Sequence, residues 1–228
     1  MGTQERVRPA FYALRPGGWR DYVTLLHLPY TVWNLSYVAV GAALAPTFHL
    51  DRMLWGFGAF FLALGVAAHA LDELNGRPLG TRIPGPVLVG LAVASLGGAL
   101  AIGVGAAVAW GYGLLVFVVI GGAIVPAYNL EWFGGALHNT LGLALCWAAF
   151  PVLTSYWVEA QTLRVEAFAG AVYAASLIGA QRILSTPARQ ARRLDGDPGA
   201  AAPFESALRL IALGAVAIGV AAVAARLR

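Results

Sequence analysis

One short segment gathers ionisable side chains at the end of a long apolar run. His69, Asp72 and Glu73 are spaced i, i+3 and i+4, so a helix places them on one face. Arg77 follows one turn later, and the glycine and proline beside it predict that the helix ends there. Charged side chains are costly at the end of a membrane helix, so the cluster predicts a functional site.

Two chemistries suit these residues. Asp72 and Glu73 can hold Mg²⁺ together with substrate phosphates, because Mg²⁺ takes one or two carboxylates in such sites. In the alternative, the two acids cap the helix end and pair with Arg77 and Arg82. His69 is a metal ligand, a base, a hydrogen-bonded partner of Asp72, or a satisfied core histidine.

Composition indicates an integral membrane protein that forms a single domain over residues 1–228. Of its residues, 59% are hydrophobic and 11% are charged, whereas a soluble domain is about half apolar and one quarter charged. All fifteen basic residues are arginine, and they lie between apolar runs, so the net charge of +4 predicts no nucleic-acid partner. Cys146 is the only cysteine, which excludes an intrachain disulfide and a thiolate metal cluster.

Seven apolar runs are long enough to cross a bilayer, which takes roughly 17–25 residues each. The fold class we expect is therefore all-α, a polytopic bundle of seven transmembrane helices. The expected spans are Tyr22–Ala45, Met53–Leu74, Pro86–Ala109, Tyr112–Tyr128, Leu137–Trp157, Glu166–Leu184 and Phe204–Ala224.

The arginines predict the orientation, because short cytoplasmic loops carry an excess of basic residues. With seven spans, most arginines fall on the side of the N-terminal segment 1–21 and of the polar loops 75–85 and 185–203. We therefore expect a cytoplasmic N-terminus and an outside C-terminus, in a prokaryotic plasma membrane.

The second polar loop supplies guanidinium groups. Arg182, Ser185 and Arg189 share one face if the helix continues past Ser185, with a bend at Pro187. Guanidinium binds phosphate oxygens in bidentate fashion. The two loops together predict a cavity that opens to the cytoplasm, with carboxylates on one wall and arginines on the other.

Several of these residues resemble motifs of the UbiA superfamily of intramembrane prenyltransferases. Asp72-Glu73 followed by Arg77-Pro78-Leu79 is similar to the acidic motif and the Arg-Pro-Leu that close the family's second helix. Tyr128 resembles the tyrosine that ends its fourth helix, and the run 141–159 is similar to the fifth helix of the menaquinone-type branch. The family usually has nine spans and a second aspartate motif, and here glutamine, serine and arginines replace that motif.

The resemblance implies a substrate and a site. An isoprenoid diphosphate would be transferred to a lipophilic or aromatic acceptor, or cyclised, with Mg²⁺ on Asp72 and Glu73 and with His69 as a further catalytic residue. Arg77, Arg182 and Arg189 would bind the diphosphate in place of a second metal ion. The alternative is a non-catalytic relative that binds an isoprenoid, quinone or pigment, or that serves as a structural subunit of a membrane complex.

Three more polar residues are candidates for substrate contact. Asn34 and Asn139 lie inside apolar runs, where interhelical hydrogen bonding is the ordinary role. Tyr128 ends a span on the side of the polar loops, where an interfacial aromatic residue needs no further function.

Overall fold

The computed structural model describes residues 8–228, and every regular element in that range is a helix. In chain order these are α1 (Trp19–Leu25), α2 (Leu28–Leu44), α3 (Leu50–Phe60), η1 (Phe61–Ala68), α4 (His69–Leu74), α5 (Gly85–Trp110), α6 (Leu114–Asn129), α7 (Trp132–Gly135), α8 (Thr140–Ala144), η2 (Leu145–Ala149), α9 (Phe150–Ala160), α10 (Val165–Arg193) and α11 (Pro198–Arg226). The segments η1 and η2 are π-helical and continue the helices on either side of them. The expected all-α fold is therefore confirmed over the described residues.

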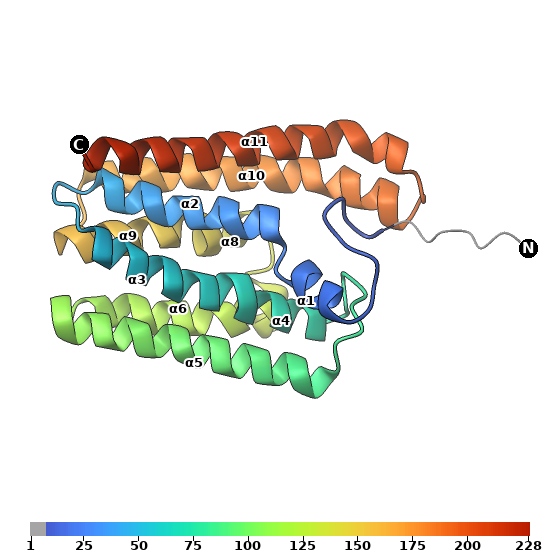
Figure 1. Cartoon of the computed structure of the whole chain (residues 1–228), viewed down its shortest axis with the longest axis horizontal. Helices are drawn as coiled ribbons and strands as arrows, with labels where there is room; N and C mark the ends of the chain where they lie inside the picture. Colours follow the sequence, from blue (N-terminus) through green and yellow to red (C-terminus); the bar gives the residue numbers. More distant parts are fainter. Residues whose placement is uncertain (1–7) are drawn as a thin grey trace, which may run out of the picture.

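Over the described part of the chain, five helices are long and apolar enough to cross a membrane. They are Leu50–Leu74, Gly85–Trp110, Thr140–Ala160, Val165–Arg193 and Pro198–Arg226. Helices α2 and α6, with 17 and 16 residues, are shorter and lie where the first and fourth spans were expected. The long helices pack side by side as a bundle (Figure 1), which fits an integral membrane protein. The count of seven spans stays a prediction.

Helix α2 is the centre of the packing and contacts α9, α10 and α11. Its Trp33 and Tyr37 are fully buried. Gly41 brings α2 against α9, because a Cβ at this position would overlap the carbonyl oxygen of Val152. Across the same contact the Ser155 hydroxyl donates a hydrogen bond of 2.7 Å to the carbonyl of Val38. A small residue on α2 therefore sets how closely the two helices approach.

The first expected span, Tyr22–Ala45, is broken near its start. Helix α1 ends at Leu25 and α2 begins at Leu28, with His27 between them at φ 45° and ψ 45°. The cause is local, since Pro29 lacks the N–H that would continue the helical hydrogen bonds through this point. Proline is well tolerated in the first turn of the new helix.

The prediction of a polar loop over residues 185–203 is wrong for most of these residues. Helix α10 continues through Pro187 to Arg193, and α11 begins at Pro198, so only residues 194–197 connect them. Packing explains the continuation, because Ser185 and Ala188 are buried in a helix that lies along α11. The other expected polar loop is observed, since residues 75–84 contain no helix.

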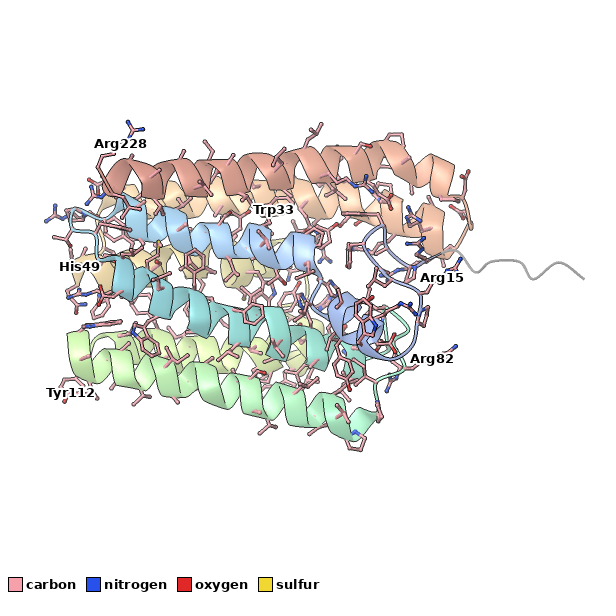
Figure 2. The ribbon with its side chains drawn as sticks, viewed as in Figure 1. Arg15, Trp33, His49, Arg82, Tyr112 and Arg228 are labelled. Atoms are coloured by element: carbon pink, nitrogen blue, oxygen red, sulfur yellow. The ribbon has the colours of Figure 1, made fainter. Side chains whose placement is uncertain are left out.

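The two ends of the bundle differ in composition. Figure 2 places Arg15 and Arg82 at one end, and His49, Tyr112 and Arg228 at the other. The end of α10 and the start of α11 lie at the first end, together with the loop 75–84 (Figure 1). We call this the arginine-rich end. That it faces the cytoplasm stays a prediction.

Candidate functional site

A cavity of about 410 Å³ lies at the arginine-rich end of the bundle. Residues from α2, η1, α4, α6, η2, α10 and α11 line it, and the N-terminal segment 9–12 lies across it. Its wall combines charged groups with aromatic and aliphatic side chains. The predicted residues that line it are Asn34, His69, Asp72, Tyr128, Arg182 and Arg189. Glu73, Arg77 and Asn139 do not.

Helix α10 supplies the basic wall. Arg182, Arg189 and Arg193 line the cavity at spacings of seven and four residues, which is one face of a helix. Arg192 also lines it, but its guanidinium makes a two-bond ion pair with the buried Glu205 of α11. Among the described residues no carboxylate is paired with the other three arginines, so this wall carries a net positive charge.

Asp72 is the acidic group opposite. It lies near the end of α4, is half-buried, and interacts through its charge with His138, Arg189 and Arg193. No described residue donates a hydrogen bond to its carboxylate. Asp72 is therefore available to a ligand or to an ion that accompanies one.

Glu73 follows Asp72 in the sequence, but it stabilises the loop 75–84 and does not line the cavity. It is 1% exposed, and its two carboxylate oxygens accept hydrogen bonds from the backbone N–H groups of Leu79 at 3.0 Å and Thr81 at 2.7 Å. Arg77 braces the same loop, donating to the carbonyls of Thr81 and Ile83 at 2.9 Å each. Arg77 pairs with neither Asp72 nor Glu73. Its guanidinium donates to loop carbonyls instead, and the Glu73 carboxylate accepts from loop N–H groups.

We expect Glu73→Gln to lower the free energy of unfolding by about 2–3 kcal/mol. Hydrogen bonds to a buried charge are worth about 1.5–3 kcal/mol each, and the amide would set an NH₂ group against one of the two backbone donors. Asp72→Asn is the matched control and should change stability by less than about 0.5 kcal/mol. Thermal unfolding in detergent, followed by circular dichroism, measures both. Equal losses in the two variants would contradict this account of Glu73.

Two histidines face each other beside Asp72. The rings of His27 and His69 stack with centroids 4.1 Å apart and planes 9° apart. His69 Nδ1 lies 3.1 Å from the carbonyl of Gly65, so Nδ1 carries the proton and Nε2 is left as an acceptor. The Tyr12 hydroxyl bonds to His27 Nδ1 at 2.9 Å. Burial and the nearby Tyr30 raise the pKa of Tyr12, which therefore stays protonated.

Tyr128 and the two asparagines have separate roles. The Tyr128 ring stacks on His138, with centroids 4.8 Å apart, and meets Trp147 edge-on at 5.3 Å. Asn34 is buried against the cavity, and its Oδ1 has no hydrogen-bond partner within residues 8–228. Asn139 instead caps α8, where its side chain accepts from the Gly142 N–H at 2.9 Å. Its role is the cap that an asparagine commonly supplies at a helix start.

The inner part of the cavity is apolar. Its lining there consists of Trp33, Leu64, Ala68, Leu143, Trp147 and Ile178. Three of these side chains, Leu64, Ala68 and Trp147, come from the π-helical segments and belong to one buried cluster. Segments of π-helix are rare and occur often at functional sites. The whole cavity suits an amphiphile with an anionic group at the arginines and an apolar body further in.

Sequence reasoning missed several lining residues, namely Tyr12, His27, His138, Gln181 and Arg193. Arg193 could have been predicted, since extending the helical face of residues 182–189 by one turn includes it. No spacing in the sequence indicated that His27 or Tyr12 lines the cavity. Their approach depends on the turn between α1 and α2 and on the fold of the N-terminal segment.

Comparisons of this chain with family models, curated proteins and solved structures found no match. Within residues 8–228, no three His, Cys, Asp or Glu side chains are grouped so that they could hold a metal ion.

Proposed function

We propose that the cavity binds an isoprenoid diphosphate, and that the protein is a UbiA-like prenyltransferase that transfers or cyclises the isoprenoid. One observation carries the proposal: three arginines that pair with no carboxylate of residues 8–228 line the same cavity as Asp72, above an apolar inner wall. An anionic head and a branched apolar tail match the two parts of this cavity in order. The proposal also takes the bundle to have seven spans, with the arginine-rich end in the cytoplasm.

The arginines would hold the diphosphate. Arg182, Arg189 and Arg193 offer planar donor groups that match phosphate oxygens, so their attraction for the ligand does not require a metal ion. Diphosphate also relieves the mutual repulsion of the three cations. Arg77 has no part in this binding, because its guanidinium braces the loop 75–84.

Asp72 is the residue that would hold Mg²⁺. A single carboxylate together with phosphate oxygens is a set of ligands that Mg²⁺ accepts, and Asp72 has no competing hydrogen bond. Glu73 is excluded from this set by its two bonds to the loop backbone. When bound, Mg²⁺ supplies positive charge that stabilises the departing diphosphate.

The residues that line the cavity suit a substitution reaction at the allylic carbon of the isoprenoid. The allylic carbon–oxygen bond breaks with its electron pair on the diphosphate, where the arginines stabilise the charge. A nucleophilic atom of a lipophilic or aromatic acceptor, or a double bond of the same isoprenoid, then bonds to that carbon. The attacking group loses a proton, and Nε2 of His69, which lines the cavity and is left as an acceptor, would take it.

A second function is favoured by a specific observation. Glu73 bonds to the loop backbone, so Asp72 is the only one of the two predicted carboxylates that lines the cavity. Metal-assisted departure of diphosphate would be expected to use a pair of acids. The protein would then bind an isoprenoid, quinone or pigment without turnover, or serve as a structural subunit of a membrane complex.

Thermal unfolding with farnesyl diphosphate tests the proposal, first with MgCl₂ and then with EDTA. A ligand that prefers the folded state raises the melting temperature, so we expect a rise in both conditions and a larger one with Mg²⁺. Asp72→Asn should remove the Mg²⁺-dependent part and keep the remainder, which comes from the arginines.

Two outcomes separate the alternatives. No rise with farnesyl or geranylgeranyl diphosphate would contradict the proposal and point to a neutral quinone or pigment. Binding without release of inorganic diphosphate, over a panel of phenolic and lipid acceptors, would favour the non-catalytic function.

A further inference from the structure

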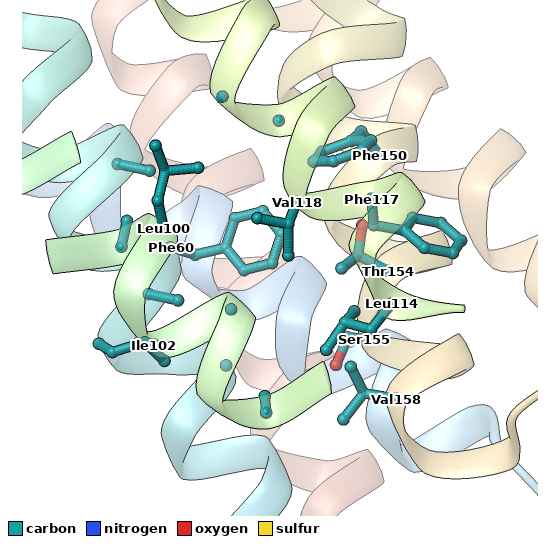
Figure 3. Close-up of a pocket in the computed structure, with 18 of the residues that line it drawn as sticks. Phe60, Leu100, Ile102, Leu114, Phe117, Val118, Phe150, Thr154, Ser155 and Val158 are labelled. Atoms are coloured by element: carbon teal, nitrogen blue, oxygen red, sulfur yellow. The ribbon is translucent and has the colours of Figure 1, made fainter. Parts of the chain in front are cut away.

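A second hollow lies among α3, η1, α5, α6, η2 and α9 (Figure 3). It extends to Arg52 and Trp110, at the ends of α3 and α5 that lie away from the arginine-rich end (Figure 1). Its cavity volume is about 110 Å³, and almost all of its lining is apolar. Trp55 lines it and is 56% exposed, so the hollow reaches the outer surface of the bundle. We call it the lateral groove. In a membrane its mouth faces lipid.

The groove is narrow. Phe60, Phe117 and Phe150 enter it from three helices, and Gly121 leaves the space beside Phe150 open. Its volume is below the roughly 150 Å³ of an apolar cavity that accepts one benzene ring. The groove therefore holds only part of one hydrocarbon chain, and the rest of the chain lies in lipid outside the mouth.

Three polar side chains interrupt the apolar lining, and one of them, Ser155, already donates its hydroxyl to the carbonyl of Val38. Thr154 is buried, and its hydroxyl has no hydrogen-bond partner among residues 8–228. Arg52 lies at the outer end of the groove, where it donates to the Val158 carbonyl at 3.0 Å and stands over the Trp110 ring at 5.5 Å. No carboxylate in the described chain pairs with Arg52. A ligand would thus meet a cation at the mouth and one hydroxyl further in.

The spacing of these groups identifies the ligand. Thr154 precedes Val158 by one helical turn, so it lies about 6 Å deeper along α9. In a glycerophospholipid an ester carbonyl lies a few bonds below the phosphate, and a chain continues from that carbonyl. We infer that the lateral groove binds an anionic glycerophospholipid, with its phosphate on Arg52, an ester carbonyl on Thr154 and one acyl chain along the groove.

The inference does not depend on the proposed function, because the two sites take different ligands and open at opposite ends, although their linings meet at Leu64 and Trp147. The glycerol backbone sits at the level of Trp110, in the interfacial zone where tryptophan is enriched in membrane proteins. Anionic lipids are preferred because the cationic group of a zwitterionic headgroup would lie near the Arg52 guanidinium and repel it.

The test compares lipid binding to the delipidated protein in detergent, measured by native mass spectrometry. We expect dioleoylphosphatidylglycerol to bind about fivefold or more tightly than dioleoylphosphatidylcholine, as one arginine near a headgroup implies. Arg52→Gln should abolish the preference. Arg226→Gln is the matched control, since Arg226 also donates to a backbone carbonyl at this end but lies outside the groove.

Three further variants test the depth of the site. Ala106→Leu fills the groove and should weaken both lipids, whereas Ala109→Leu, on the exposed side of the same helix, should weaken neither. Thr154→Val should weaken both lipids about fivefold while keeping the preference for the anionic one. Excess glycerol phosphate should not compete, because it lacks the chain.

Equal binding of the two lipids by the unaltered protein would overturn the inference. So would an equal loss of preference in Arg52→Gln and Arg226→Gln. Farnesyl diphosphate binding, measured on the same variants, should not change, so a failure here is distinguishable from a failure of the proposed function.

Discussion

Replacing Arg182 and Arg189 together by glutamine is expected to lower the affinity for farnesyl diphosphate about a thousandfold. Each arginine lines the cavity without a carboxylate partner, and a charge-assisted hydrogen bond contributes about 1.5–3 kcal/mol. Each single variant should therefore lose about tenfold to a hundredfold. Isothermal titration calorimetry in detergent, with MgCl₂ and with EDTA, measures the change.

The same variants distinguish a binding role from a structural one. Removing like charges that face one cavity relieves repulsion, so the ligand-free double variant should melt at the same temperature or higher. Arg82→Gln is the control, because Arg82 is an exposed arginine at the same end and outside the cavity. A double variant that unfolds more easily, or an Arg82 variant that binds as weakly, would contradict the assignment of the basic wall.

Gly41→Ala is expected to cost at least about 3 kcal/mol of stability. The added Cβ would overlap the Val152 carbonyl oxygen and lie 3.0 Å from its carbon atom. Both are backbone atoms of a packed helix and cannot rotate away, so α2 and α9 must separate. The separation would also stretch the hydrogen bond from Ser155 to Val38.

Gly90→Ala is the matched control for this prediction. Gly90 lies in α5, where an added Cβ meets no atom within 4 Å. Alanine forms helices better than glycine, so the control should be neutral or stabilising by up to about 1 kcal/mol. Melting temperatures of both variants in one detergent measure the contrast. Similar losses would show that the distance between α2 and α9 is not set by Gly41.

The cluster His69, Asp72 and Glu73 shows how sequence and structure divide the information. The sequence predicted one functional face, because i, i+3 and i+4 residues are neighbours on a helix. The structure keeps His69 and Asp72 at the cavity and turns Glu73 to the loop backbone. Spacing cannot separate adjacent residues whose directions differ by about 100°, because the choice between cavity and loop belongs to the partners that surround the helix.

The helix boundaries divide in a similar way. Long apolar runs predicted that the long helices exist and where their apolar parts lie, since hydrophobicity and length are properties of a segment by itself, but α10 and α11 extend beyond the expected spans. Pro29 and Pro187 behave differently: the first lies at a break, and the second lies inside α10. The difference comes from packing, because the turns beyond Pro187 are buried along α11 and tied to it by the pair of Arg192 with Glu205.

The sequence alone determined that this is an all-helical membrane protein with its arginines gathered between apolar runs, because composition and periodicity act within each segment. Only the tertiary structure decided which of the polar residues meet. The stack of His27 on His69, the approach of Tyr12 and the narrow groove below Arg52 each join elements that are far apart in the chain. No spacing rule encodes such contacts, since they arise when the helices bury their faces against one another.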